Sequence, residues 1–141
     1  MIQNPEQHQS LLDSPDSALT EILRWSSTNA YVQRLARRDF RFADQQIRAG
    51  DVVTLWNVSA NRDDRQFPQP HRFDITRSPN RYLSYGSGLH RCVGAPLAQI
   101  GLTVLFERLV RHRVRFDLAG DVVPLHSNFI LGTARLPLTY R

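Results

Sequence analysis

The sequence predicts an α+β fold that is mainly helical and carries small β-sheets. Two segments, near residues 15–25 and 96–110, have apolar residues at helical spacing. Short apolar runs between turn signals predict strands before residue 56 and beyond residue 120. The 141 residues contain no repeat or low-complexity tract and are long enough to bury a sizeable core. We therefore expect residues 1–141 to belong to one domain.

The first helix is predicted to begin at Ser14-Pro15, with Ser14 as N-cap and Pro15 at the first helical position. From Leu19 onward, apolar residues follow at spacings of three and four. Glu21 and Arg24 lie three residues apart on this helix, so their side chains can meet. Taken alone, such a pair is most simply a surface ion pair worth a few tenths of a kcal/mol.

Strands are predicted where short apolar runs alternate with turn residues. The clearest strand runs from Val52 to Trp56, after the turn Ala49-Gly50-Asp51. Near the end of the chain, runs at residues 122–123 and 136–138 predict closing strands. These segments account for the β part of the fold.

The second helix is predicted from Pro96 to about Val110. Its apolar positions predict a mostly buried helix, and they include Leu97, Ile100, Val104 and Leu105. Its last turn is basic, as suits the negative end of a helix dipole. The basic residues there are Arg108, Arg111, His112 and Arg113.

The segment from Leu83 to Ala98, LSYGSGLHRCVGAPLA, contains the only cysteine of the chain, Cys92. A thiolate is a soft metal ligand, and here it precedes a helix whose positive end favours an anion. Three glycines surround the cysteine and let the backbone pass close to a flat cofactor. Cys92 is therefore a candidate metal ligand, and the alternative is an inert buried thiol.

The spacing around Cys92 resembles the haem-binding signature of the cytochromes P450, F-G-x-G-x-H-x-C-x-G-x-x-L-A, and in particular the soluble bacterial type. The matching residues are Tyr85, Gly86, Gly88, His90, Cys92, Gly94, Leu97 and Ala98. Only Tyr85 departs, standing where the family mostly has phenylalanine. The resemblance implies that Cys92 is the axial ligand of haem b (heme b, iron protoporphyrin IX) in an oxidoreductase of the monooxygenase class, and that Tyr85, Gly86 and Gly94 belong to the cofactor site.

Other parts of the chain are similar to further family motifs. Glu21 and Arg24 match the E-x-x-R of the K helix, and Arg72, in Pro70-His71-Arg72-Phe73, matches the arginine that joins this pair. The resemblance implies that these three residues form a structural network. Arg34 and His90 are implied to hold the haem propionates, although each would suit a solvated surface role equally well.

The resemblance covers the C-terminal portion of the P450 fold: the K helix, meander, haem-binding loop, L helix and C-terminal strands. The [AG]-G-x-x-T pattern of the distal, oxygen-activating helix is not found in the sequence. We therefore expect a truncated or split cytochrome P450 that is not competent alone and needs a missing N-terminal P450 half. One alternative is a small haem-binding or partner-binding protein without monooxygenase activity. A third is a product that does not fold stably.

The chain carries a net charge of +5 with a pI near 10.3, and all 18 basic residues are arginines. No zinc-finger, RNP or helix-turn-helix pattern accompanies them, so we expect no nucleic-acid binding. An acidic ferredoxin or flavodoxin-type electron donor is the better expected partner. No membrane span or signal peptide is evident and there is one cysteine, so we expect a cytoplasmic protein.

Overall fold

The computed structural model describes residues 2–141, and Met1 lies outside them. Its helices are η1 (Pro5–Gln7), α1 (His8–Asp13), α2 (Pro15–Ser26), α3 (Asn57–Ala60), η2 (Gly88–His90) and α4 (Ala95–Arg111). Its strands are β1 (Val32–Leu35), β2 (Phe40–Phe42), β3 (Gln45–Ile47), β4 (Val52–Leu55), β5 (Phe116–Leu118), β6 (Val123–Pro124), β7 (Thr133–Arg135) and β8 (Leu138–Tyr140). The predicted α+β class with small sheets is confirmed.

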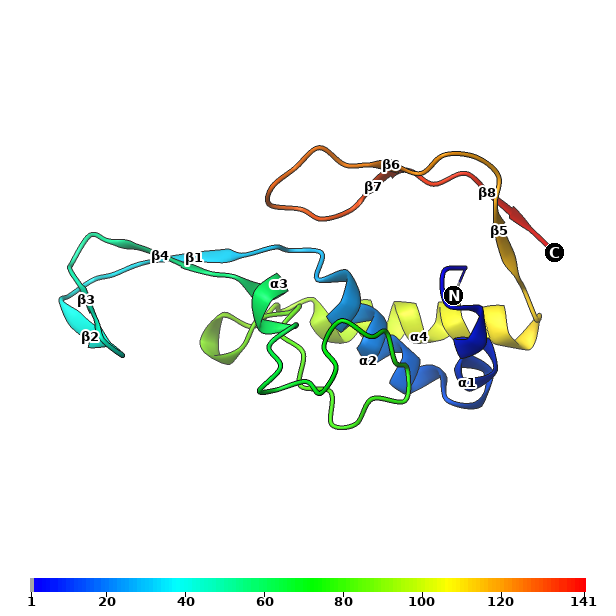
Figure 1. The fold of residues 1–141 in the computed structure, drawn as a ribbon, viewed down its shortest axis with the longest axis horizontal. Helices are drawn as coiled ribbons and strands as arrows, with labels where there is room; N and C mark the ends of the chain where they lie inside the picture. Colours follow the sequence, from blue (N-terminus) through cyan, green and yellow to red (C-terminus); the bar gives the residue numbers. More distant parts are fainter. Residues whose placement is uncertain (1) are drawn as a thin grey trace.

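The strands form antiparallel pairs, β1 with β4, β2 with β3, β5 with β8 and β6 with β7. Figure 1 shows that these pairs make two arms on a helical body, one carrying β1 to β4 and the other carrying β5 to β8. The arms meet where Ala30 N–H donates to the Phe129 carbonyl (2.9 Å) and Leu131 N–H donates to the Thr28 carbonyl (2.7 Å). The C-terminal arm is thereby tied to the root of the first arm.

Helix α2 begins at Pro15, as predicted, because the ring of proline fixes a φ suited to the first helical position. The side chain of Ser14 makes no capping bond, so its predicted N-cap hydrogen bond is absent. Instead, the Ser14 carbonyl accepts from the Ala18 N–H at 3.2 Å. The helix ends at Ser26, and the next residue, Ser27, has a left-handed backbone with φ of 40°.

The hydrophobic core lies between α1, α2, α4 and the irregular segment around residue 74. Its buried members are Leu11, Ala18, Phe73 and Ile75. Trp25 of α2 packs on Phe73 edge to face, with ring centroids 5.6 Å apart. This core fixes α2 against the segment that leads towards the Cys92 loop.

Helix α4 extends over the predicted range, but the prediction that it is mostly buried is wrong. Among its described residues only Ala95 is buried, while Leu97 is 76% and Ile100 is 62% exposed. Val104 and Leu105 are also exposed. The reason is that α4 contacts α2 and the core along one side through Phe106 and Val110, and the other side faces solvent.

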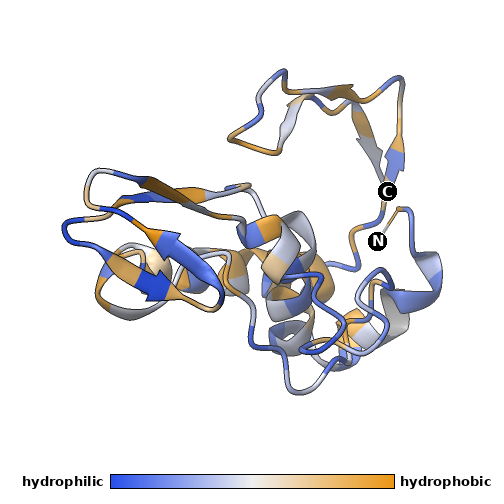
Figure 2. Cartoon of the chain, turned by 60° about the vertical axis from the view of Figure 1, so that its left-hand side comes forward, coloured by the Kyte–Doolittle hydropathy of each residue, from blue (hydrophilic) through white to orange (hydrophobic). Residues whose placement is uncertain are grey.

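Apolar side chains are also exposed on the arms. Figure 2 shows apolar positions along the strands of both arms as well as in the helical body. The predicted strand at 52–56 is confirmed as β4, and its partner register places Arg34 of β1 opposite Val53. The predicted strand at 122–123 overlaps β6 by one residue, and the one at 136–138 overlaps β8 by one residue. No helix within residues 2–141 has the length and apolar character to cross a membrane.

Candidate functional site

The loop that carries Cys92 is closed by three backbone hydrogen bonds. Gly86 N–H donates to the Leu83 carbonyl at 2.8 Å, and Cys92 N–H donates to the Tyr85 carbonyl at 2.8 Å. Between them, Arg91 N–H donates to the Gly88 carbonyl at 3.1 Å. Helix α4 begins three residues after Cys92. The Cys92 thiol is free and exposed, so the alternative of a buried thiol is wrong.

Two glycines of this loop adopt a backbone that other residues rarely adopt. Gly86 has φ of +70° and Gly88 has φ of +67°, both in the left-handed region. Gly94 lies close to the sulfur instead, because a Cβ built on it would come within 3.8 Å of Cys92 Sγ. Gly86 and Gly88 therefore set the path of the loop, and Gly94 places no side chain against the sulfur.

Among residues 2–141, the donor atoms around Cys92 are too few to hold a bare metal ion. No group of three or more His, Cys, Asp or Glu side chains able to hold a metal ion occurs in the described part of the chain. A bare ion would thus find fewer than three such protein ligands here, whereas a haem iron comes with four nitrogen donors of its own and would need only Cys92 from this chain. The apolar side chains beside Cys92, Leu89 and Val93, are fully exposed. These residues fit a flat, apolar cofactor better than a free ion.

Tyr85 packs against a second tyrosine beside the loop. Its ring meets that of Tyr82 at 6.2 Å between centroids, and Gln99 of α4 donates to the Tyr82 hydroxyl at 2.9 Å. Burial raises the pKa of Tyr85, and the nearby Tyr82 and Cys92 groups raise it further. The Tyr85 hydroxyl therefore stays protonated and neutral.

Arg34 and His90, for which the family resemblance implies contacts with the haem propionates, both have exposed side chains. Arg34 lies in β1 and donates from its guanidinium to the adjacent Gln33 carbonyl at 2.8 Å. His90 ends η2, two residues before Cys92. Neither side chain is paired with a carboxylate among residues 2–141. Both are thus free to meet an anionic group.

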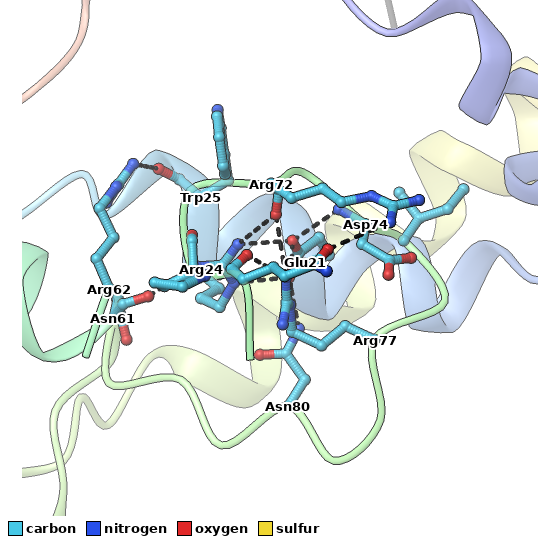
Figure 3. A network of polar contacts seen from close by, with 12 residues as sticks. Glu21, Arg24, Trp25, Asn61, Arg62, Arg72, Asp74, Arg77 and Asn80 are labelled. Carbon is cyan, nitrogen blue, oxygen red and sulfur yellow. Dashed lines mark hydrogen bonds and ion pairs between the residues drawn. The ribbon is translucent and has the colours of Figure 1, made fainter. Parts of the chain in front are cut away.

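Helix α2 carries a buried ion pair. Arg24 Nε donates to Glu21 Oε2 and Arg24 Nη2 donates to Glu21 Oε1, both at 2.7 Å. Both side chains are 0% exposed, so the surface-pair alternative does not apply. Asp74 N–H and the Asn80 amide also donate to the Glu21 carboxylate, each at 2.9 Å. Figure 3 shows how these groups converge from the helix and from the irregular segment.

The second guanidinium at this carboxylate belongs to Arg77. Arg77 Nε lies 3.3 Å from Glu21 Oε2, and its side chain is only 7% exposed. The expectation that Arg72 supplies this guanidinium is wrong, because the Arg72 side chain is exposed and contacts Gln69. Arg72 joins the network through its carbonyl, which accepts from Arg24 at 3.3 Å and from Arg77 at 3.0 Å. Both arginines lie in one irregular segment, and no local pattern separates them.

Trp25 is flanked by two arginines on the other side of the network. The guanidinium of Arg24 lies 5.6 Å and that of Arg62 lies 5.3 Å from the centroid of its ring. Burial lowers the pKa of Arg62, and the positive charge of Arg24 lowers it further. Arg62 also donates to the Trp25 carbonyl at 2.9 Å, which ties the end of α3 to α2.

The exposed basic residues near α4 do not form one patch. Arg91 precedes the helix, whereas Arg108, Arg111 and Arg113 lie at its other end. Thirteen residues of helix separate Ala95 from Arg108, which corresponds to about 20 Å. The basic residues near α4 therefore lie in two separate groups, one beside the Cys92 loop and one at the far end of the helix.

The chain is similar to cytochromes P450 over almost its whole length. The family model "Cytochrome P450" matches residues 4–138. The methyl-branched lipid omega-hydroxylase of Mycobacterium bovis is 38% identical over 125 residues, which cover 88% of this chain and 29% of that protein. The linalool 8-monooxygenase of Pseudomonas putida is 37% identical over 137 residues, covering 95% of this chain and 34% of that protein. The chain thus spans about a third of the length of these relatives.

Solved structures agree with the sequence relatives. Cytochrome P450-153 from Novosphingobium aromaticivorans superposes with a TM-score of 0.94 at 35% identity, covering 99% of this chain and 36% of the other. The P450BioI structure in complex with an acyl carrier protein that carries hexadec-9Z-enoic acid gives a TM-score of 0.90 at 34% identity. This match covers 99% of our chain and 37% of the P450BioI chain. With the match running over nearly every residue, from the Glu21–Arg24 pair through the Cys92 loop to the last strands, the chain belongs to the cytochrome P450 family.

Proposed function

We propose that this chain forms the thiolate side of a P450 haem site, with Cys92 as the iron ligand. Members of the family bind haem b. The observation that carries the proposal is the exposed Cys92 thiol, held ahead of α4 by a hydrogen-bonded glycine turn. In our proposal Gly86 and Gly94 let the cofactor approach, and Tyr85 covers the sulfur side.

Arg34 and His90 are proposed to meet the two propionates of the cofactor. Both are exposed and free of carboxylate partners within the described residues, and an arginine or histidine cation facing a carboxylate is favourable where water is partly excluded. The network of Glu21, Arg24 and the Arg72 carbonyl, together with Arg77, is assigned a structural role. Its contacts hold the irregular segment of residues 61–80 against α2.

The proposed activity of the complete fold is that of a monooxygenase. A haem held here would supply oxygen activation, and a thiolate ligand favours O–O cleavage by donating electron density. The relatives are named for a methyl-branched lipid and for linalool, so we propose a hydrophobic substrate. Bacterial P450s generally receive electrons from ferredoxin or flavodoxin-type donors, and we propose such a donor here. The cytoplasm is the proposed location.

We place these residues in one partial P450 domain that needs the rest of the fold for turnover, whether that part is on the same chain or on another. The exposed apolar side of α4 supports this need, since monomeric proteins rarely leave such faces bare. A second candidate is a small haem-binding protein without monooxygenase activity. It is favoured by the open sulfur and by the exposed Leu89 and Val93 beside it, which are available on this chain alone.

The test is a haem titration followed by the reduced-minus-reduced-CO difference spectrum of the parent, Cys92→Ser and Ser87→Ala. Ser87 is an exposed residue of the same loop, so its variant controls for a change in the turn itself. We expect a thiolate-type Soret band in the parent and in Ser87→Ala but not in Cys92→Ser. Equal spectra for all three would exclude Cys92 as the ligand. Haem uptake without oxygen-dependent turnover, even after the rest of the fold is added, would favour the second candidate.

A further inference from the structure

One buried residue, Asn61, contacts both the ion network on α2 and the loop that carries Cys92. It follows α3 directly and is 0% exposed. Its main-chain carbonyl accepts from Arg24 Nη1 at 2.7 Å. Its side-chain oxygen accepts from the Leu83 N–H at 2.7 Å. Asn61 therefore contacts both the buried pair and the first residue of the Cys92 loop.

The amide nitrogen of Asn61 makes two further hydrogen bonds. It donates to the hydroxyl of Ser27 at 2.9 Å and to the hydroxyl of Ser84 at 3.0 Å. Ser27 is the residue after α2, and its own hydroxyl donates to the Arg24 carbonyl at 2.7 Å. The Ser84 hydroxyl donates to the Leu23 carbonyl. Both serines thus tie Asn61 to the C-terminal turn of α2.

A continuous series of hydrogen bonds leads from Asn61 to the backbone of Cys92. The Asn61 side-chain oxygen accepts from the Leu83 N–H, and the Leu83 carbonyl accepts from the Gly86 N–H at 2.8 Å. The carbonyl of Tyr85, within this turn, accepts from Cys92 N–H at 2.8 Å. All polar atoms of the Asn61 side chain are used, so no shorter or charged residue can make the same set of bonds.

We propose that Asn61 is a positioning residue whose side chain fixes the Cys92 loop to the C-terminal turn of α2, next to the buried Glu21–Arg24 pair. Without the Asn61 side chain, the Leu83 N–H and the hydroxyls of Ser27 and Ser84 lose their shared hydrogen-bond partner. The turn ahead of Cys92 is then held less firmly in position against α2. The effect on haem binding rests on the proposed function, because it requires Cys92 to be the haem ligand. The effect on the loop itself does not depend on that proposal.

The loop effect is tested by amide hydrogen exchange on the 141-residue chain, comparing the parent with Asn61→Ala and Asn57→Ala. Asn57 is a matched control, because it is a buried asparagine at the start of α3, the helix that Asn61 follows, and its side chain contacts Asn29, away from the Cys92 loop. We expect Asn61→Ala to speed exchange at the Gly86 and Cys92 amides by about tenfold or more relative to amides in α4. Asn57→Ala should leave that ratio unchanged.

A role in overall stability alone would speed exchange in the loop and in α4 equally, and that result would overturn the proposal. Ser84→Ala removes one of the Asn61 contacts and covers the case in which Asn61→Ala does not fold. Ser84→Ala should increase the exchange rates by less than Asn61→Ala does, and again more at the loop amides than at the α4 amides. An unchanged loop-to-helix ratio in Ser84→Ala would also count against the proposal.

The haem effect is measured as the share of the thiolate-type band in the reduced-CO spectrum. Asn61→Ala should lower this share, while Asn57→Ala should keep the value of the parent. If the parent binds haem and both variants keep its spectrum, the proposed positioning role is wrong. If the parent binds no haem, the proposed function of this chain fails by itself, and hydrogen exchange still decides whether Asn61 holds the loop.

Discussion

Replacing Arg77 with alanine should destabilise the fold far more than replacing Arg72, although both lie in the same irregular segment. The Arg77 side chain is 7% exposed and pairs with Glu21. It also donates to the carbonyls of Pro68 (2.7 Å), Gln69 (3.2 Å) and Arg72 (3.0 Å). The Arg77 guanidinium therefore holds the carbonyls of residues 68–72 close to Glu21 of α2.

The expected loss for Arg77→Ala is about 2–3 kcal/mol. A hydrogen bond to a charged group contributes about 1.5–3 kcal/mol, but the carbonyls near the surface can be hydrated once the side chain is gone. Glu21 keeps the bidentate contact with Arg24, so the loss stays below the ~3–5 kcal/mol of a fully broken buried pair. Arg72→Ala should cost about 0.5 kcal/mol or less, because alanine keeps the carbonyl through which Arg72 acts.

Urea unfolding followed by tryptophan fluorescence and circular dichroism would measure both variants against the parent. With a urea slope of about 1–3 kcal/mol/M, Arg77→Ala should lower the midpoint by about 1 M, while Arg72→Ala should shift it little. The slope should stay constant, which shows that stability rather than the unfolded state has changed. Equal losses in the two variants, or a larger loss for Arg72→Ala, would refute the assignment of Arg77 as the second guanidinium.

The Asp63 carboxyl should titrate at about 2 instead of 3.8, because Arg65 donates to it from its side chain and from its backbone. This folded pKa lies below the unfolded one, so the pair stabilises the fold above pH 3.8. That contribution is lost as the pH falls through about 2. NMR titration of Arg65→Ala should show a raised titration midpoint for Asp63. An unmoved Asp63 midpoint would contradict the pairing. Gly101→Ala should stabilise the fold by up to ~1 kcal/mol, because a methyl group there meets no atom within 4 Å and alanine favours α4. Gly86→Ala should instead destabilise it by about 1–2 kcal/mol because of its φ of +70°, so thermal midpoints that move in the same direction would contradict this reasoning.

Local chemistry was enough to predict the two long helices, α2 and α4, and one strand, β4. Pro15 marks the start of α2, and the apolar periodicity gives the extent of α4 to within a residue at either end. The burial of α4 could not be obtained in the same way. Periodicity shows which side of a helix is apolar, but whether another element covers that side depends on the tertiary structure. Leu97 and Ile100 fit the helical pattern and are nevertheless exposed.

The candidate site was predictable where the residues are close in sequence. Glu21 and Arg24 are one helical turn apart, so their contact follows from the helix itself. The choice between Arg72 and Arg77 depends on how an irregular segment returns to α2, which no spacing rule specifies. Asn61 is a similar case, because its partners at Leu83 and Ser84 lie more than twenty residues further along the chain.

The exposed thiol of Cys92 also determines how the protein has to be handled. Since the chain has one cysteine, any disulfide it forms must join two molecules. Exposed thiols are also the ones most readily oxidised to sulfenic acid and beyond. Either product removes the thiolate that would bind iron, so an aged sample would behave like Cys92→Ser although its sequence is intact. A covalent dimer on a non-reducing gel would reveal that state before any spectrum is recorded.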